Sequence, residues 1–110
     1  MKKQILGLSS DLRFFLFHKP VSMQGGIEKL KGLVINELDR DPTNGDVYIF
    51  LSSNRKQIKL LHYENYVFTM YVRRIYKGRF VYPEYDPQKD KYIISMEKLI
   101  KLIRGYASRV

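Results

Sequence analysis

Residues 47–74 decide the fold and read VYIFLSSNRKQIKLLHYENYVFTMYVRR. The continuous apolar run Val47–Leu51 predicts a strand that is buried on both faces. Two further runs, Gln57–Tyr63 and Tyr66–Arg74, predict strands joined by a tight turn at Glu64-Asn65. This stretch therefore predicts the centre of an antiparallel sheet.

The position of this turn also determines which residues of the two hairpin strands lie opposite each other. If Tyr63 lies opposite Tyr66, the hairpin has one apolar face and one face with a basic end. The apolar face is the better candidate for the core, and the other is the better candidate for contact with a partner. A slip of one residue would exchange the two faces. The apolar face holds Leu61, Tyr63, Tyr66, Phe68, Met70 and Val72, and the other holds Lys56, Ile58, Leu60, His62, Val67, Thr69, Tyr71 and Arg73.

The segments before this stretch predict a strand and a helix. Residues Arg13–His18 are mostly aromatic and apolar, and Lys19-Pro20 closes them, which is typical of a buried strand. Apolar residues then recur at helical spacing over residues 23–39, with Ser22 in the position of an N-cap.

The segments after it predict two short strands and a second helix. The strands are Phe80–Tyr82 and Tyr92–Ile94. The helix begins after Ser95 as N-cap and ends at Gly105. Residues 1–110 are thus expected to form a single small α+β domain, with an antiparallel sheet of about five strands and two helices.

Composition excludes several classes of protein. The 110 residues include no cysteine, so disulfides, thiolate metal sites and a cysteine nucleophile are excluded. The longest apolar runs are far shorter than the ~20 residues of a membrane helix. Residues 1–3 (MKK) lack the apolar run of a signal peptide. We therefore expect a cytoplasmic protein that has no membrane partner.

Most of the net charge of +9 is concentrated in one segment. Residues 52–82 carry seven basic residues and one acid, Glu64, a net of +6. Tyr71 and Tyr76 lie among them. Cations interleaved with aromatic rings are typical of nucleic-acid binding, although a solvated basic sheet face has the same composition. The candidate phosphate contacts are Arg55, Lys56, Lys59, Arg73, Arg74, Lys77 and Arg79.

Signals of catalysis are poor. His18 and His62 lie in strand-like segments without metal-ligand spacing, and neither a phosphate-binding loop nor a dinucleotide-binding motif is present. Gly25-Gly26 at a helix start is more typical of a backbone adjustment than of a phosphate site. The acids show no cluster suited to a metal-dependent nuclease. We expect no enzyme activity, no cofactor, no metal and no small-molecule substrate.

An ordered series of motifs resembles a known family. It consists of residues 19–34 (KPVSMQGGIEKLKGLV), 36–38 (NEL), 40–50 (RDPTNGDVYIF), 54–55 (NR), 58–61 (IKLL), 71–75 (YVRRI) and 77–83 (KGRFVYP). The series resembles the accessory protein called TnpB in the insertion-sequence-66 family of bacterial transposable elements, over roughly residues 8–104. It is unrelated to the RNA-guided nuclease of the same name.

The chain departs from the family pattern at three places. Residues 22–25 (SMQG) stand where the family has D-M-R-K, Tyr63 replaces a tryptophan, and Lys56 replaces the second arginine of N-R-R. The resemblance implies a protein that is encoded beside a larger transposase and assists transposition without cutting DNA. The leading hypothesis is a DNA-binding accessory factor, and the alternative is a module that docks on the transposase without contacting DNA.

Overall fold

The computed structural model describes residues 4–17, 19–82 and 93–104. In this part of the chain, two helices and seven strands follow one another in a mixed order. The elements are β1 (Gln4–Ile5), β2 (Leu8–Ser9), β3 (Phe14–Leu16), α1 (Ile27–Glu37), β4 (Val47–Leu51), β5 (Gln57–Glu64), β6 (Val67–Arg74), β7 (Ile93–Ile94) and α2 (Met96–Arg104).

The main sheet has five strands in the order β6-β5-β4-β3-β7, and β1 pairs with β2 in a small separate ribbon. The α+β class with two helices and a five-stranded sheet is thus confirmed. The sheet is mixed rather than antiparallel, because β3 and β4 run parallel, with Phe15 opposite Tyr48. The chain passes through α1 between these strands, and a crossover of that length allows parallel neighbours.

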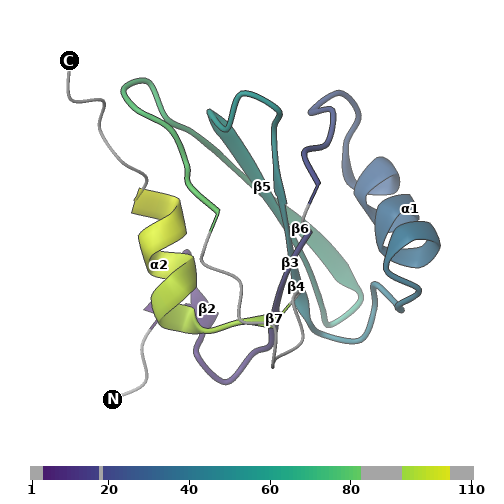
Figure 1. Ribbon diagram of the computed structural model, residues 1–110. Coiled ribbons are helices and arrows are strands. Elements are labelled where there is room, and N and C mark those ends of the chain that lie inside the picture. The colour runs from purple at the N-terminus through teal and green to yellow at the C-terminus, as the bar shows by residue number, and fades with distance from the viewer. Residues whose placement is uncertain (1–3, 18, 83–92, 105–110) are drawn as a thin grey trace.

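The sheet is covered on both faces, by α1 on one side and α2 on the other (Figure 1). On the α1 side, Phe50 and Leu61 pack with Leu30 and Val34 of the helix. On the α2 side, the core includes Ile58, Leu60, Phe80 and Leu99, while partly buried Tyr71 packs against it. The expectation that the hairpin face with Ile58 and Leu60 is a contact surface is therefore wrong for the β5 part of that face, because both residues are fully buried. On β6, Val67, Thr69 and Arg73 of the same face are exposed.

The β5–β6 hairpin turns one residue later than predicted. Its turn residues are Asn65 and Tyr66, both with positive φ (51° and 66°), and Glu64 pairs with Val67. Moving the turn by one residue moves the pairing by two, so that Tyr63 lies opposite Phe68 instead of Tyr66. Every side chain that remains in the two strands keeps its predicted face, because the period of a strand is two residues, whereas Tyr66 leaves the apolar face for the turn.

Helix α1 begins four residues later than predicted, and Ser22 is not its N-cap. Gly26 takes the N-cap position without a side-chain bond, and the Ser22 hydroxyl accepts a hydrogen bond from the backbone N–H of Gln24 (3.2 Å). Gly25 has φ +87°, and a Cβ there would lie 3.0 Å from Cδ of Lys29. The chain therefore turns sharply at this glycine before the helix begins.

The described residues after the hairpin agree with the sequence prediction except at one segment. The Ser95 hydroxyl accepts a hydrogen bond from the backbone N–H of Lys98 (3.2 Å), which confirms the predicted N-cap of α2. Phe80–Tyr82 is not a strand, and the side chain of Phe80 is instead buried in the α2-side core. Predictions for His18, Tyr92 and Gly105 lie outside the described residues.

Candidate nucleic-acid interface

One end of the main sheet brings together two segments that are separated in the sequence. The backbone N–H of Ile75 donates to the carbonyl of Lys56 (2.9 Å), and that of Phe80 donates to the carbonyl of Arg55 (2.7 Å). The β4–β5 turn therefore lies against the segment that follows β6. We call this surface the basic end, and it consists of Arg55, Lys56, Arg73, Arg74, Tyr76, Lys77 and Arg79.

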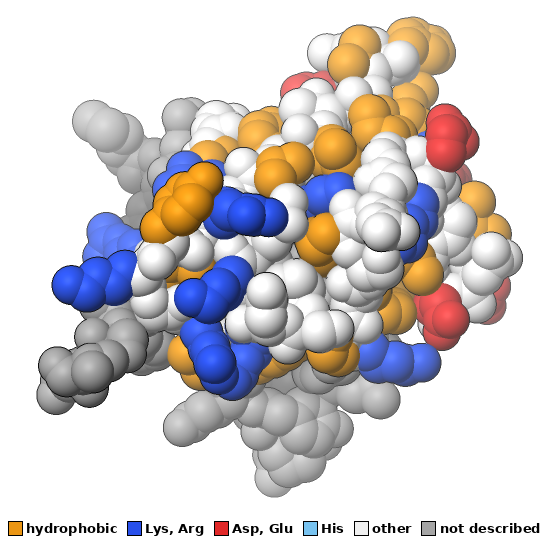
Figure 2. All heavy atoms as spheres, turned by 90° about the horizontal axis from the view of Figure 1, so that it is seen from above, with side chains coloured by type: hydrophobic (Ala, Val, Ile, Leu, Met, Phe, Trp, Pro, Cys, Tyr) orange, Lys and Arg blue, Asp and Glu red, His pale blue; other side chains and the backbone are white. Residues whose placement is uncertain are grey.

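The six cations of the basic end have no acidic partner in the part of the chain that the structure describes. Four of them are exposed, whereas Arg55 and Lys56 are half-buried. Glu64, the one acid of residues 52–82, lies at the opposite end of the hairpin beside its turn. Figure 2 looks onto this region and shows Lys and Arg side chains gathered there, with Asp and Glu at the edge of the view.

Two of the sequence-predicted site residues lie outside this surface. Lys59 is 6% exposed, and its ammonium group donates to the carbonyls of Met23 (2.8 Å) and Gly25 (3.1 Å). Tyr71 is half-buried against the α2-side core. Lys59 therefore anchors the segment before α1, and Tyr71 packs against the α2-side core of the sheet.

Arg73 and Arg74 belong to the basic end but point to opposite sides of β6. Arg73 pairs with Ile58, whose side chain lies in the α2-side core, and Arg74 pairs with Gln57. Both are exposed. Because β6 is the edge strand of the sheet, the two guanidinium groups extend the positive surface around that edge.

We expect Lys59→Met to destabilise the fold. Methionine retains the apolar stem but removes the donor, which leaves two carbonyl groups without their charged partner. The free energy of unfolding should fall by about 1–3 kcal/mol, measured by urea denaturation. The exposed Lys101→Met on α2 is the control and should change it by less than about 0.5 kcal/mol. Equal stability of the two variants would contradict the anchoring role.

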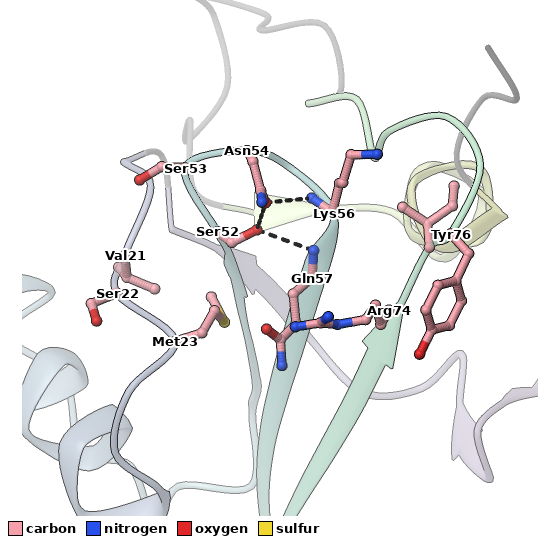
Figure 3. Close-up of a pocket in the computed structure, with 11 residues that line it drawn as sticks. Val21, Ser22, Met23, Ser52, Ser53, Asn54, Lys56, Gln57, Arg74 and Tyr76 are labelled. Carbon is pink, nitrogen blue, oxygen red and sulfur yellow. Dashed lines mark hydrogen bonds between the residues drawn. The ribbon is translucent and has the colours of Figure 1, made fainter.

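A pocket of about 420 Å³ opens beside the basic end (Figure 3). Its walls come from the segment before α1, the β4–β5 turn and the end of β6. Sequence reasoning missed it because three segments far apart in the chain form it. In Figure 3, Arg74 extends across Gln57 toward Met23. The lining residues are Val21, Ser22, Met23, Ser52, Ser53, Asn54, Lys56, Gln57, Arg74, Ile75 and Tyr76.

The turn that forms one wall of this pocket is held by its own hydrogen bonds. The Ser52 hydroxyl donates to Oδ1 of Asn54 (2.8 Å) and accepts from the backbone N–H of Gln57 (3.1 Å). The same Oδ1 accepts from the backbone N–H of Lys56 (3.0 Å). Arg55 adopts φ +57° within this turn. The bonds hold the wall in one shape before any ligand arrives.

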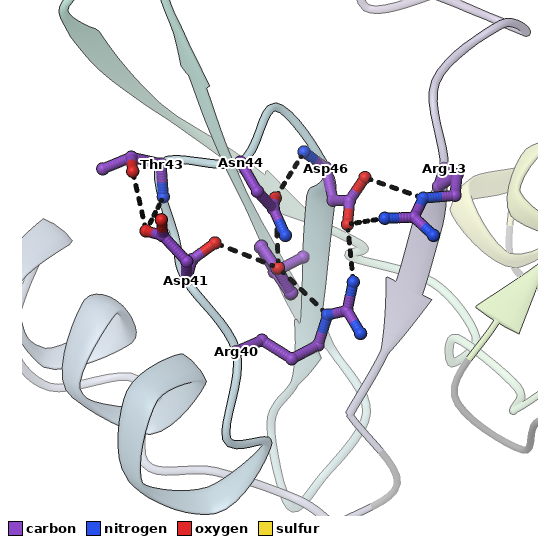
Figure 4. A network of polar contacts seen from close by, with 7 residues as sticks. Arg13, Arg40, Asp41, Thr43, Asn44 and Asp46 are labelled. Atoms are coloured by element: carbon purple, nitrogen blue, oxygen red, sulfur yellow. Dashed lines mark hydrogen bonds and ion pairs between the residues drawn. The ribbon is translucent and has the colours of Figure 1, made fainter.

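A second group of cations, outside the basic end, is paired with an acid within the fold (Figure 4). Arg13 donates to both carboxylate oxygens of Asp46 (3.1 and 3.0 Å), and Arg40 donates to one of them (3.0 Å). The Arg40 guanidinium also donates to the Tyr48 hydroxyl (3.3 Å) and lies 4.0 Å from the ring centre of Phe15. The bonds to Tyr48 and Asp46 raise the pKa of Arg40 against the opposing effect of burial. These cations therefore stabilise the fold.

One tyrosine beside the basic end has a shifted pKa. Burial raises the pKa of Tyr82, and the nearby charge of Arg55 partly opposes that shift. The phenol therefore stays neutral at physiological pH.

No sign of a metal site or a membrane segment appears among the described residues. They contain no group of three or more His, Asp or Glu side chains that could hold a metal ion. His62 is buried in the hairpin. No helix in residues 4–17, 19–82 and 93–104 has the length and apolar character needed to cross a bilayer.

Comparisons with known proteins agree with the family resemblance of the motif series. The family described as "IS66 Orf2 like protein" matches residues 12–110. An uncharacterized protein of Sinorhizobium fredii, y4jC, is 26% identical over 102 residues, which cover 92% of this chain and 85% of that protein. No solved structure matches the chain. The family match spans the sheet, both helices and the basic end, and the chain therefore belongs to the IS66 Orf2-like family, with a role related to transposition.

Proposed function

We propose that this protein is a non-catalytic accessory factor for transposition of a bacterial insertion sequence and that it binds DNA through the basic end. The observation that carries the proposal is the gathering of six cations at one end of the sheet without acidic partners among the described residues. Family membership supports the link to transposition, and the charge pattern supports DNA as the partner.

The physical argument is electrostatic. Like charges within about 10 Å of one another repel, and a neighbouring acid normally relieves that repulsion. The fold supplies such an acid, Asp46, to Arg13 and Arg40, but supplies none to the basic end among the described residues. Phosphates of DNA would take that place and release their counterions, which makes binding favourable and dependent on salt. Contacts of this kind position the protein without reading sequence.

A second candidate function is docking on the transposase of the element. The observation in its favour is the tip of the β5–β6 hairpin, where Tyr66 is 94% and Val67 57% exposed. Exposed aromatic and β-branched side chains at a projecting turn are suited to a protein partner. This tip lies at the other end of the hairpin from the basic end, so the two functions do not exclude each other.

The two candidates are separated by testing each partner alone. The purified protein is titrated against a labelled DNA duplex at low salt, and it is also tested for co-purification with the transposase after nuclease digestion. We expect duplex binding, and we expect co-purification to be lost once DNA is digested. Nuclease-resistant co-purification without any duplex binding would replace the proposal with the alternative.

A further inference from the structure

The pocket beside the basic end has an unusual combination of walls. Its apolar lining residues are Val21 and Met23, which pack on the α1 side of the sheet, and Ile75, which packs on the α2 side. Lys56 and Arg74 are its two cations. Among the residues that the structure describes, no acidic side chain lines it. A ligand suited to these walls has a negative group for a cation and a flat apolar part for the apolar side chains.

Polar and aromatic groups narrow the chemistry further. Asn54 and Gln57 bring side-chain amides, which carry both donors and acceptors, and Ser22 and Ser53 bring hydroxyls. The ring of Tyr76 is 87% exposed at the pocket, free of a packing role in the core. Amides suit the edge of a nucleic-acid base, and an exposed ring suits stacking on its face.

The pocket has the size of a small-molecule site. A volume of about 420 Å³ lies within the range of small-molecule sites, about 300–1,000 Å³. A base within a duplex is stacked between its neighbours and cannot enter a pocket unless it leaves the helix. The occupant therefore has to be unpaired.

We propose that this pocket binds one unpaired nucleotide of single-stranded DNA, with its phosphate at Arg74 and its base against Tyr76. This inference rests on the proposed function, because the pocket opens onto the surface proposed to bind DNA. It adds that the protein prefers DNA with an unpaired strand, such as a tail or a junction, over an intact duplex.

The test compares a blunt duplex with the same duplex carrying a short unpaired thymine tail at either its 3′ or its 5′ end. Fluorescence anisotropy should show one of the tailed duplexes binding about tenfold more tightly than the blunt one. Tyr76→Ala should abolish that advantage, so that the tailed and the blunt duplex bind with equal affinity. Because Tyr76 belongs to the basic end, the readout is the ratio of the two affinities. Tyr66→Ala is the matched control, because Tyr66 is equally exposed at the far end of the hairpin. A 2-aminopurine in the tail should lose fluorescence on binding to the wild type and not to Tyr76→Ala.

The outcomes separate this inference from the proposed function. Blunt and tailed duplexes of equal affinity, or an equal loss for both with Tyr76→Ala, would overturn the pocket assignment while duplex binding stands. A free nucleoside monophosphate that binds as tightly as the tailed duplex, or an RNA tail that binds more tightly than DNA, would also overturn it. If neither DNA binds, the proposed function fails and this inference fails with it.

Discussion

Reversing two charges after β6, with Lys77→Glu and Arg79→Glu together, is expected to weaken binding to duplex DNA by about 100-fold at low salt. Both side chains are exposed and have no ion pair among the described residues, so the fold should not depend on them. Each phosphate contact releases about one counterion, which contributes about tenfold in affinity at low salt. Anisotropy with a labelled duplex measures the loss.

The control for this variant carries the same change of net charge on a different surface. Lys98→Glu with Lys101→Glu places two acids on α2, outside the basic end. Its affinity should fall less than tenfold, because only the long-range field changes. An equal loss in both double variants would show that net charge alone governs binding, which contradicts a defined surface. Thermal denaturation of both variants checks that each one folds.

Asp46→Ala is expected to lower the free energy of unfolding by about 3 kcal/mol. The Asp46 side chain is 7% exposed and accepts three charged hydrogen bonds, from Arg13 and Arg40. Alanine would leave Arg40 against the ring of Phe15 without its ion-pair partner. The expected cost lies at the lower end of values for broken buried pairs, because Arg13 is 60% exposed and regains water. Urea denaturation measures the change.

An aspartate in the same loop provides the comparison. Asp41 is exposed, and its carboxylate accepts bonds from the backbone N–H and hydroxyl of Thr43 (2.9 and 2.7 Å). These bonds lower the pKa of Asp41, so their small contribution is present at neutral pH and is lost as the pH falls through that lowered value. Asp41→Ala should therefore cost less than Asp46→Ala at pH 7. A larger loss of unfolding free energy for Asp41→Ala than for Asp46→Ala would contradict the role of Asp46 as the shared partner of Arg13 and Arg40.

The parts of the fold that local sequence determines were predicted well. The strand Val47–Leu51 is apolar throughout and lies at the centre of the sheet, and Ser95 caps its helix as its position indicates. The parallel pairing of β3 with β4 depends on where α1 packs. The packing position of a helix cannot be predicted from a local sequence pattern. The hairpin turn at Asn65-Tyr66 lacks the glycine that marks such turns, so the turn was placed one residue early.

The candidate site was predicted in outline and missed in detail. Clustered charge identified the segment, but charge alone does not distinguish Lys59 from its exposed neighbours. Strand alternation does distinguish it, because Lys59 shares a face with Leu61, a residue predicted to be in the core. The carbonyls that Lys59 binds belong to the turn at Gly25, which the sequence predicted as part of a helix. The pocket beside Arg74 could not be predicted, because it needs the packing of three distant segments.

The salt dependence of duplex binding by the wild-type protein tests the central claim most directly. With six cations on phosphates, a plot of log affinity against log salt concentration should have a slope of about −5. Lys77→Glu with Arg79→Glu should reduce the slope to about −3, because two contacts are lost. A slope near zero, or no duplex binding at low salt, would contradict the account of the basic end as a DNA-binding surface.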